Sequence, residues 1–135
     1  MLLPFLLALA APVADPCQPP RNRRYDDPRP FQKAGPGLWI GGLGFISTDI
    51  ADARAAESQY GDGWTVELVF TTEGKAKFIR AQHCGVGKVL EISIDRHVLS
   101  RPTLYEPILG GRAMITGHWK TREEAEAVIR QITGR

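Results

Sequence analysis

The chain of 135 residues has no hydrophobic run long enough to cross a membrane as a helix. A spanning helix needs about 20 apolar residues, and the uncharged stretch that opens the chain is interrupted between Pro12 and Asp15. Residues 1–10 have the composition of the apolar core of a secretory signal, and Ala8-Leu9-Ala10 offers the small residues of a cleavage site. We therefore predict a signal peptide over residues 1–10, cleaved near Ala10. A short membrane anchor and a buried apolar strand are the alternatives.

Neither sign of charge is in large excess. The chain has 17 Lys and Arg against 15 Asp and Glu, and residues 45–135 hold twelve of each kind. A neutral folded part excludes a dedicated nucleic-acid surface, which would show a clustered basic face, so we expect no nucleic-acid partner. The cluster of Arg21, Arg23 and Arg24 gives the N-terminal stretch either a weak contact with anionic membrane or a solvated basic tail.

Cysteine is scarce, and Cys17 and Cys84 are the two that occur. In an oxidising compartment an even pair favours a disulfide; the alternative is two free thiols, with Cys84 buried. His83 and Cys84 have neither the ligand number nor the ligand spacing of a zinc site. A nucleophilic thiol at Cys84 would need a base and an orienting group, which makes a small thiol-dependent enzyme the weakest interpretation. We assign no catalytic residue, no metal ligand and no cofactor.

Two glycine-rich stretches resemble nucleotide-binding loops only in part. Residues 85–88 lack the first glycine and the Ser or Thr of a phosphate-binding loop, and they follow an expected helix rather than a strand. Residues 35–44 have no leading strand and no βαβ unit after them. We interpret both stretches as ordinary loops.

Proline is concentrated near one end of the chain. Eight of the ten prolines lie in residues 1–36. We predict that residues 11–44 form a Pro-, Arg- and Gly-rich flexible arm. Within the arm, Leu38-Trp39-Ile40 is either a short strand or a loop that docks Trp39. The folded domain is expected over residues 45–135.

Residues 45–135 alternate between strand and helix patterns. Period-two apolar residues indicate strands, and capping threonines indicate the helix starts at Thr71 or Thr72 and at Thr121. The expected strands lie near residues 50–56, over 64–71, over 90–94, around 98–99 and over 112–117, and the expected helices over 71–82 and 121–132. This order predicts an α+β fold, with a mixed, mostly antiparallel sheet and two helices packed on one face.

Two local features leave alternatives open. A two-residue hairpin turn after Ile94 would place Arg96 at positive φ, which favours glycine; otherwise the loop is longer and comprises residues 95–97. Further on, Pro102 and Pro107 bracket residues 103–106. Because proline lacks a backbone donor, this stretch lies at a sheet edge or crosses between strands.

An ordered series of short motifs covers residues 47–132. The series is Ser47-Thr48-Asp49, Phe70-Thr71, Lys77-Phe78, Gly87-Lys88, Leu90 to Asp95, Val98 to Pro102, Glu106-Pro107-Ile108, Gly110-Gly111, Ile115-Thr116-Gly117 and Glu124-Ala125. In this order the motifs resemble the head subdomain of the first periplasmic domain of SecD and SecDF. For residues 50–56, whose local propensity fits strand or helix, the resemblance favours a strand. The family commonly has glycine where this chain has Arg96.

The resemblance implies a stand-alone, exported, non-enzymatic module that binds unfolded or emerging preprotein in the periplasm, with Sec translocon components or another envelope protein as further partners. It does not imply proton-driven pumping, since the family carries that activity on membrane helices. Our candidate polypeptide-binding edge is Tyr105, Glu106, Pro107 and Ile108. The main alternative is a structural or regulatory docking subunit of an envelope complex unrelated to Sec.

Overall fold

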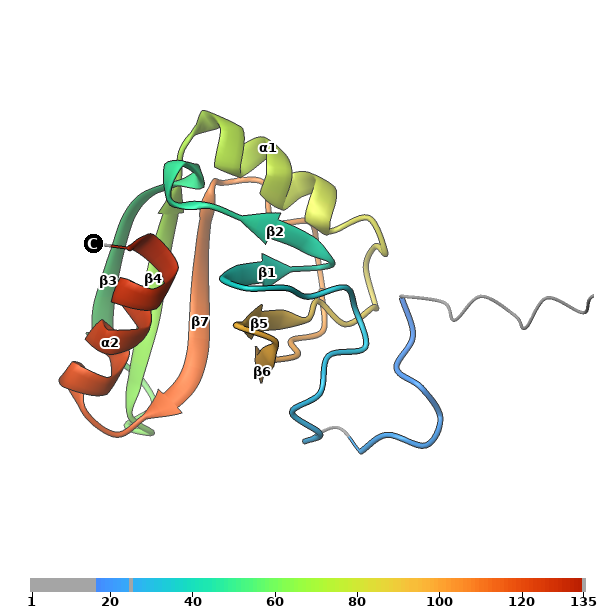
Figure 1. The fold of residues 1–135 in the computed structure, drawn as a ribbon, viewed down its shortest axis with the longest axis horizontal. Coiled ribbons are helices and arrows are strands. Elements are labelled where there is room, and N and C mark those ends of the chain that lie inside the picture. The colour runs from blue at the N-terminus through green and yellow to red at the C-terminus, as the bar shows by residue number, and fades with distance from the viewer. Residues whose placement is uncertain (1–16, 25, 135) are drawn as a thin grey trace, which may run out of the picture.

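The computed structural model describes residues 17–24 and 26–134 (Figure 1). The predicted signal peptide at residues 1–10 lies outside these residues. The elements in chain order are β1 (Leu38–Ile40), β2 (Leu43–Phe45), the 3₁₀ turn η1 (Ser47–Asp49), β3 (Ile50–Glu57), β4 (Trp64–Phe70), α1 (Thr72–Ala81), β5 (Ile92–Ile94), β6 (His97–Ser100), β7 (Arg112–Trp119) and α2 (Arg122–Thr133). The predicted α+β class is confirmed.

The strands are divided between two antiparallel sheets rather than joined in the one mixed sheet that we expected. One sheet has the order β2-β1-β5-β6 and the other has the order β3-β4-β7. The chain passes between the sheets after β2, after β4 and after β6, and the last passage is made by residues 101–111, which leave β6 and enter β7 against β4. Two prolines in this segment lack the donors that a continuing ladder would need, so the chain crosses between the sheets at this point.

Both helices pack against β4, and each has further neighbours of its own. Helix α2 packs on β3, β4 and β7, whereas α1 lies against η1, β2 and β4 (Figure 1). The Thr71 hydroxyl caps α1 by accepting from Gly74 N, and the Thr121 hydroxyl caps α2 by accepting from Glu124 N. The Glu124 carboxylate reaches back to Lys120 N at 2.9 Å, one residue before the position expected for a reciprocal capping box.

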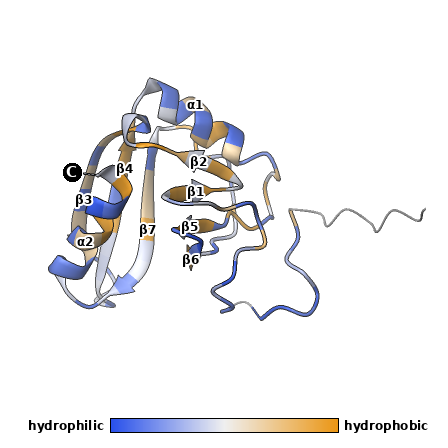
Figure 2. Ribbon diagram, in the orientation of Figure 1, coloured by the Kyte–Doolittle hydropathy of each residue, from blue (hydrophilic) through white to orange (hydrophobic). Residues whose placement is uncertain are grey.

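Both sheets and both helices contribute to one hydrophobic core, and Figure 2 shows apolar residues on β1, β4 and β5. In this core Phe70 lies between two other rings, 4.8 Å from the Phe78 ring of α1 and 5.6 Å from the Phe45 ring of β2, measured between ring centroids. This cluster joins the four-stranded sheet to the three-stranded one directly, through Phe45 and Phe70, and attaches α1 to both.

Part of the predicted flexible arm is regular structure. Residues 38–40 and 43–45 form β1 and β2, and β1 pairs with both β2 and β5. Gly41 and Gly42 have φ of 58° and 84° and make the turn between them, as a two-residue hairpin of this kind requires. Leu38 and Ile40 are almost completely buried. Of the two alternatives for Leu38-Trp39-Ile40, the strand is correct, and the glycines interpreted as a loop form the hairpin that places these two side chains in the core.

The turn between β5 and β6 is the shorter of the two alternatives. Ile94 pairs with His97, so the turn consists of Asp95 and Arg96, with φ of 49° and 70°. The Asp95 carboxylate accepts a hydrogen bond from Gly37 N at 2.7 Å. This bond ties the hairpin tip to the segment that leads into β1.

Candidate functional site

The segment from Tyr105 to Ile108 forms no strand and crosses from one sheet to the other. The Gln82 side chain holds it at the end of α1, since its amide nitrogen donates to Ile108 O at 2.9 Å and its oxygen accepts from Ile108 N at 2.7 Å. These two bonds occupy main-chain groups that an added strand would use. At Ile108 the segment therefore presents its side chain, rather than free main-chain groups, to solvent.

An apolar surface surrounds this crossing segment. Tyr105 is 84% exposed, Leu109 is 57% exposed and Ile108 is 37% exposed. Beside them lies an open hollow of about 260 Å³, lined by Leu90, Pro102, Thr103, Leu104, Tyr105, Glu106 and Ile108. Small-molecule sites usually have volumes of about 300–1,000 Å³, so this hollow fits a single apolar side chain better than a small substrate. We call Tyr105, Glu106, Ile108 and Leu109 with this hollow the crossing surface.

A second set of contacts lies next to it, around a buried ion pair. Arg101 Nε is 3.1 Å from the Glu91 carboxylate, and their side chains are only 6% and 2% exposed. A buried pair of this kind is stable only when its remaining hydrogen-bonding groups are satisfied. Here the segment before β1, described at residues 17–24 and 26–37 and called the strap below, satisfies them.

The strap binds this pair through its main chain. Phe31 N and Gln32 N donate to the Glu91 carboxylate at 3.2 and 3.1 Å. Arg101 donates to the carbonyl oxygens of Asp27 at 2.6 Å and Arg29 at 2.9 Å. The Arg101 guanidinium also lies over the Phe31 ring, 5.4 Å from its centroid. Glu91 and Arg101 together therefore bind the N–H and C=O groups of one extended segment.

Further bonds hold Pro28 and Gln32, in the middle part of the strap. Val98 N, on the edge strand β6, donates to Pro28 O at 3.0 Å. The Gln32 side-chain oxygen accepts from Glu91 N at 3.0 Å, and its amide nitrogen donates to Val89 O at 3.3 Å. The strap thus covers the free edge of β6, which is a common way of protecting an edge strand.

Acidic and basic side chains within the strap also pair with each other. The Arg29 guanidinium donates to the Asp27 carboxylate, with Nη2 2.7 Å from Oδ2. This hydrogen bond holds the pKa of Asp27 well below its ordinary value of 3.8. The two residues of this ion pair are also the two whose carbonyl oxygens accept from Arg101.

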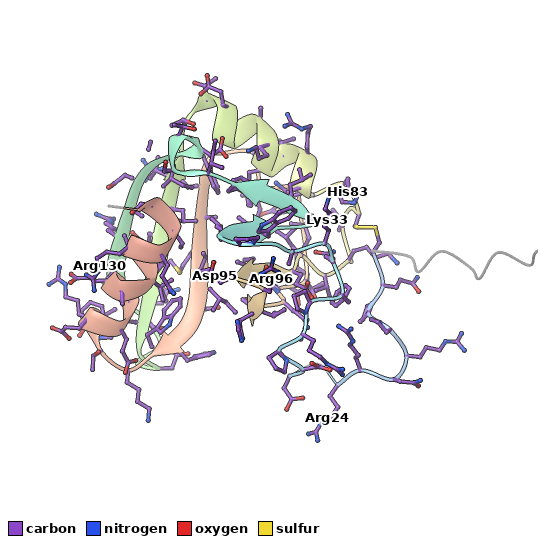
Figure 3. The ribbon with its side chains drawn as sticks, viewed as in Figure 1. Arg24, Lys33, His83, Asp95, Arg96 and Arg130 are labelled. Atoms are coloured by element: carbon purple, nitrogen blue, oxygen red, sulfur yellow. A yellow bond between two sulfur atoms is a disulfide. The ribbon has the colours of Figure 1, made fainter. Side chains whose placement is uncertain are left out.

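Cys17 and Cys84 are joined in a disulfide with an S–S distance of 2.02 Å, so the bond closes the strap onto the residues after α1 (Figure 3). His83 Nε2 lies 3.6 Å from Cys84 Sγ. Within the described residues, Cys17, His83 and Cys84 form the one group with metal-ligand proximity. Both sulfur atoms are bonded to each other, so this group offers neither a thiolate ligand nor a thiolate nucleophile in the oxidised protein.

The roles of Glu91 and Arg101 were not predicted from the sequence. The alternation of Glu91 with Leu90 and Ile92 indicates a strand, and such an alternation is typical of a side chain that faces solvent, whereas Glu91 is buried. The sequence does place one charged residue directly before β5 and another directly after β6. That both residues are buried is visible only in the structure.

No helix formed by the described residues has the length and apolarity that crossing a bilayer requires.

Comparison with known families finds a match for most of the chain. A family model described as "SecDF, P1 head subdomain" matches residues 44–134, which is more than half of the chain. The strap and β1 lie before the matched residues.

Curated relatives agree with this match. The chain is 37% identical over 95 residues to the protein translocase subunit SecDF of Thermus thermophilus, covering 70% of this chain and 12% of the relative. It is 40% identical over 78 residues to the protein translocase subunit SecD of Acidaminococcus fermentans, covering 58% of this chain and 18% of the relative. The chain therefore spans less than a fifth of the length of these two proteins.

Solved structures show the same similarity in three dimensions. One, reported as the structure and function of a membrane component SecDF that enhances protein export, has a TM-score of 0.57 and 37% identity, covering 64% of this chain and 39% of that chain. Another, a crystal structure of SecDF in a super-membrane-facing form, has a TM-score of 0.54 and 38% identity, covering 64% of this chain and 12% of that one.

Proposed function

Because the chain belongs to the family of SecDF P1 head subdomains, we propose that it takes part in protein translocation as a non-enzymatic module. In this proposal it works on the periplasmic side of the membrane and binds unfolded or emerging polypeptide. The family match supports the role in translocation. The crossing surface supports polypeptide binding, because exposed aromatic and aliphatic side chains gather there beside a hollow of side-chain size.

The crossing surface suits an unfolded chain for a physical reason. Folded proteins bury most of their large apolar side chains, whereas an unfolded chain exposes them. A hollow that takes one such side chain, beside an exposed tyrosine ring, gains about 25 cal/mol for each Å² of apolar surface removed from water. The Glu106 carboxylate at the rim adds an attraction for basic residues of the bound segment. Such contacts give weak binding with little sequence specificity.

The partners follow from this mode of binding. The proposed ligand is an unfolded preprotein, and translocon components of the Sec machinery are proposed as proteins that act beside it. A structural docking role in an envelope complex would instead need a folded partner. The two functions differ in whether an unfolded chain or a folded protein is bound.

The test is a two-dimensional NMR titration of the oxidised protein with an unfolded export substrate, with the folded form of that substrate as control. We expect shifts at residues 104–109 with the unfolded chain only. The double variant Tyr105→Ser/Ile108→Ser should weaken binding about tenfold, the effect of losing about 1.4 kcal/mol.

The chain offers a matched control for this variant. Tyr60 is 82% exposed, close to the 84% of Tyr105, and lies in the turn between β3 and β4. Tyr60→Ser should leave binding unchanged. Equal loss in both variants, or shifts with the folded substrate alone, would overturn the proposal in favour of non-specific contact or of a docking role.

A further inference from the structure

Side chains hold the strap at Gln32, Phe31 and Cys17, but five of its bonds use atoms that every polypeptide has. Asp27 and Arg29 supply carbonyl oxygens to Arg101, and Phe31 and Gln32 supply amide N–H groups to Glu91. Pro28 supplies a carbonyl oxygen to Val98 N of β6. The receiving groups form a built site, since both charged side chains are more than nine-tenths buried.

We propose that Glu91, Arg101 and the edge of β6 form a binding site for the main chain of an extended polypeptide, and that the strap occupies this site in the structure. The proposal rests on the polypeptide-binding function proposed above and adds a second, sequence-independent contact to it. An incoming extended segment replaces the strap by offering the same two N–H groups and the same carbonyl oxygens.

The strap has the properties of a replaceable occupant. Among its described residues Gln32 is the only one that is fully buried, and most of the others are exposed. Little apolar surface is therefore lost when the strap leaves. The disulfide to Cys84 closes a loop with a sequence separation of 67, which holds the strap near its site through one covalent bond even when its hydrogen bonds open. The strap also precedes residues 44–134, the part that matches the head subdomain.

The site and the crossing surface are adjacent but separate. Leu90 and Pro102 line the hollow of the crossing surface, while Glu91 and Arg101, next to them in the chain, bond the strap. Binding at each site can therefore be measured separately, from the NMR shifts of its own residues. A single extended chain is able to contact both in turn.

The first measurement is hydrogen exchange of the full oxidised chain and of Cys17→Ser. If the strap is a replaceable occupant, the amides of Phe31 and Gln32 exchange faster than those of Ile40 and Ile92, and Cys17→Ser increases the difference. If the two strap amides exchange only as slowly as the strand amides in both proteins, the strap opens only on global unfolding and the proposal is overturned.

The second measurement uses the full chain with the strap displaced. The variant Cys17→Ser/Phe31→Pro/Gln32→Pro removes both amide donors to Glu91, and the control variant Cys17→Ser/Phe31→Ala keeps them. The probe is a labelled peptide of residues 26–34, alongside the same peptide N-methylated at the positions of Phe31 and Gln32.

We expect the unmodified peptide to bind the proline variant and to shift the signals of Val98 and Arg101. The methylated peptide should bind the proline variant at least tenfold more weakly. The unmodified peptide should bind the control variant at least tenfold more weakly than it binds the proline variant. Equal binding of both peptides, no binding at millimolar concentration, or loss of the cooperative fold in the proline variant would each overturn the proposal. Retained shifts at Tyr105 with an unfolded substrate would then show that the crossing surface acts without this site.

Discussion

At the scale of single residues, the hairpin between β5 and β6 holds an arginine in a left-handed conformation. Arg96 has φ of 70° in the second position of a two-residue turn. A residue with a Cβ atom at such a φ is destabilised by about 1–2 kcal/mol. The geometry of the turn therefore favours glycine over arginine at this position.

Arg96→Gly should therefore raise the free energy of unfolding by about 0.5–1 kcal/mol, since glycine removes the strain but loses more backbone entropy on folding. Urea denaturation of the oxidised protein measures the change. Arg96→Ala is the control, because it removes the charge and keeps the Cβ atom, and should give no gain. Equal effects of glycine and alanine would place the effect on the charge instead.

The Asp27 carboxylate gives the strap a dependence on pH. Its pKa is lowered from an ordinary value of 3.8, first of all by the hydrogen bond from Arg29. A carboxyl group with a lowered pKa in the folded state stabilises that state above the unfolded pKa, and the contribution is lost as the pH falls through the folded pKa.

Strap opening should therefore increase as the pH falls from about 4 toward the lower pKa of folded Asp27. Exchange at the Phe31 and Gln32 amides, corrected for its intrinsic pH dependence, measures it. Asp27→Asn should remove most of this dependence between pH 4 and 2, whereas Asp26→Asn, on an exposed neighbour, should not. A pH profile that is the same in all three proteins would assign the effect to other carboxyl groups.

At the scale of elements, the start of α1 depends on a close backbone approach. A Cβ atom at Gly74 would lie 2.0 Å from Asp49 O of η1. Lys77, one turn further along α1, pairs with the Asp49 carboxylate at 2.6 Å and donates to Gly44 O at 3.0 Å. The glycine therefore lets α1 come close enough for this largely buried pair to form.

Gly74→Ala should lower the free energy of unfolding by about 1–3 kcal/mol, the usual effect of overpacking. The sign is informative, because Gly→Ala at an exposed position inside a helix stabilises by about 1 kcal/mol. Thermal and urea unfolding both measure it. An increase in stability would mean that η1 moves aside without loss of the Asp49–Lys77 pair.

The elements themselves were largely predictable from the sequence, and the reasons are local. The period of two from Trp64 to Phe70 and the capping residues Thr71 and Thr121 act within a few neighbouring residues, so β4, α1 and α2 lie where they were expected. The strands β1 and β2 were harder to predict, because each has only three residues and the surrounding glycines resemble a loop.

The candidate sites were less predictable, because they depend on contacts distant in sequence. Of the two alternatives for the Pro-bracketed stretch, a sheet edge or a crossing between strands, the structure shows the crossing, and the Gln82 side chain, 26 residues away, takes both main-chain bonds of Ile108. The bonds from Phe31 and Gln32 to Glu91 span about 60 residues. No local pattern encodes such pairings, so Glu91 and Arg101 became recognisable only in the fold.

At the scale of the whole molecule, one covalent bond closes the chain around its core. The disulfide joins Cys17 of the strap to Cys84 after α1, with a sequence separation of 67. Between these ends lie β1 to β4 and α1. A cross-link of this length restricts the unfolded chain strongly, because loop-closure entropy increases with the number of residues enclosed.

Cys17→Ala/Cys84→Ala should therefore lower the free energy of unfolding by about 2–4 kcal/mol, with at most about 4 kcal/mol for a loop of this length. The measurement is urea denaturation of the double variant beside the parent with and without a dithiol reductant. The reduced parent should match the variant, and the variant should not respond to reductant.

The variant should also keep its shifts at Tyr105 with unfolded substrate, since the bond stabilises the fold and does not contact that surface. Loss of those shifts in a variant that remains folded would instead assign Cys84 a part in binding or in thiol chemistry.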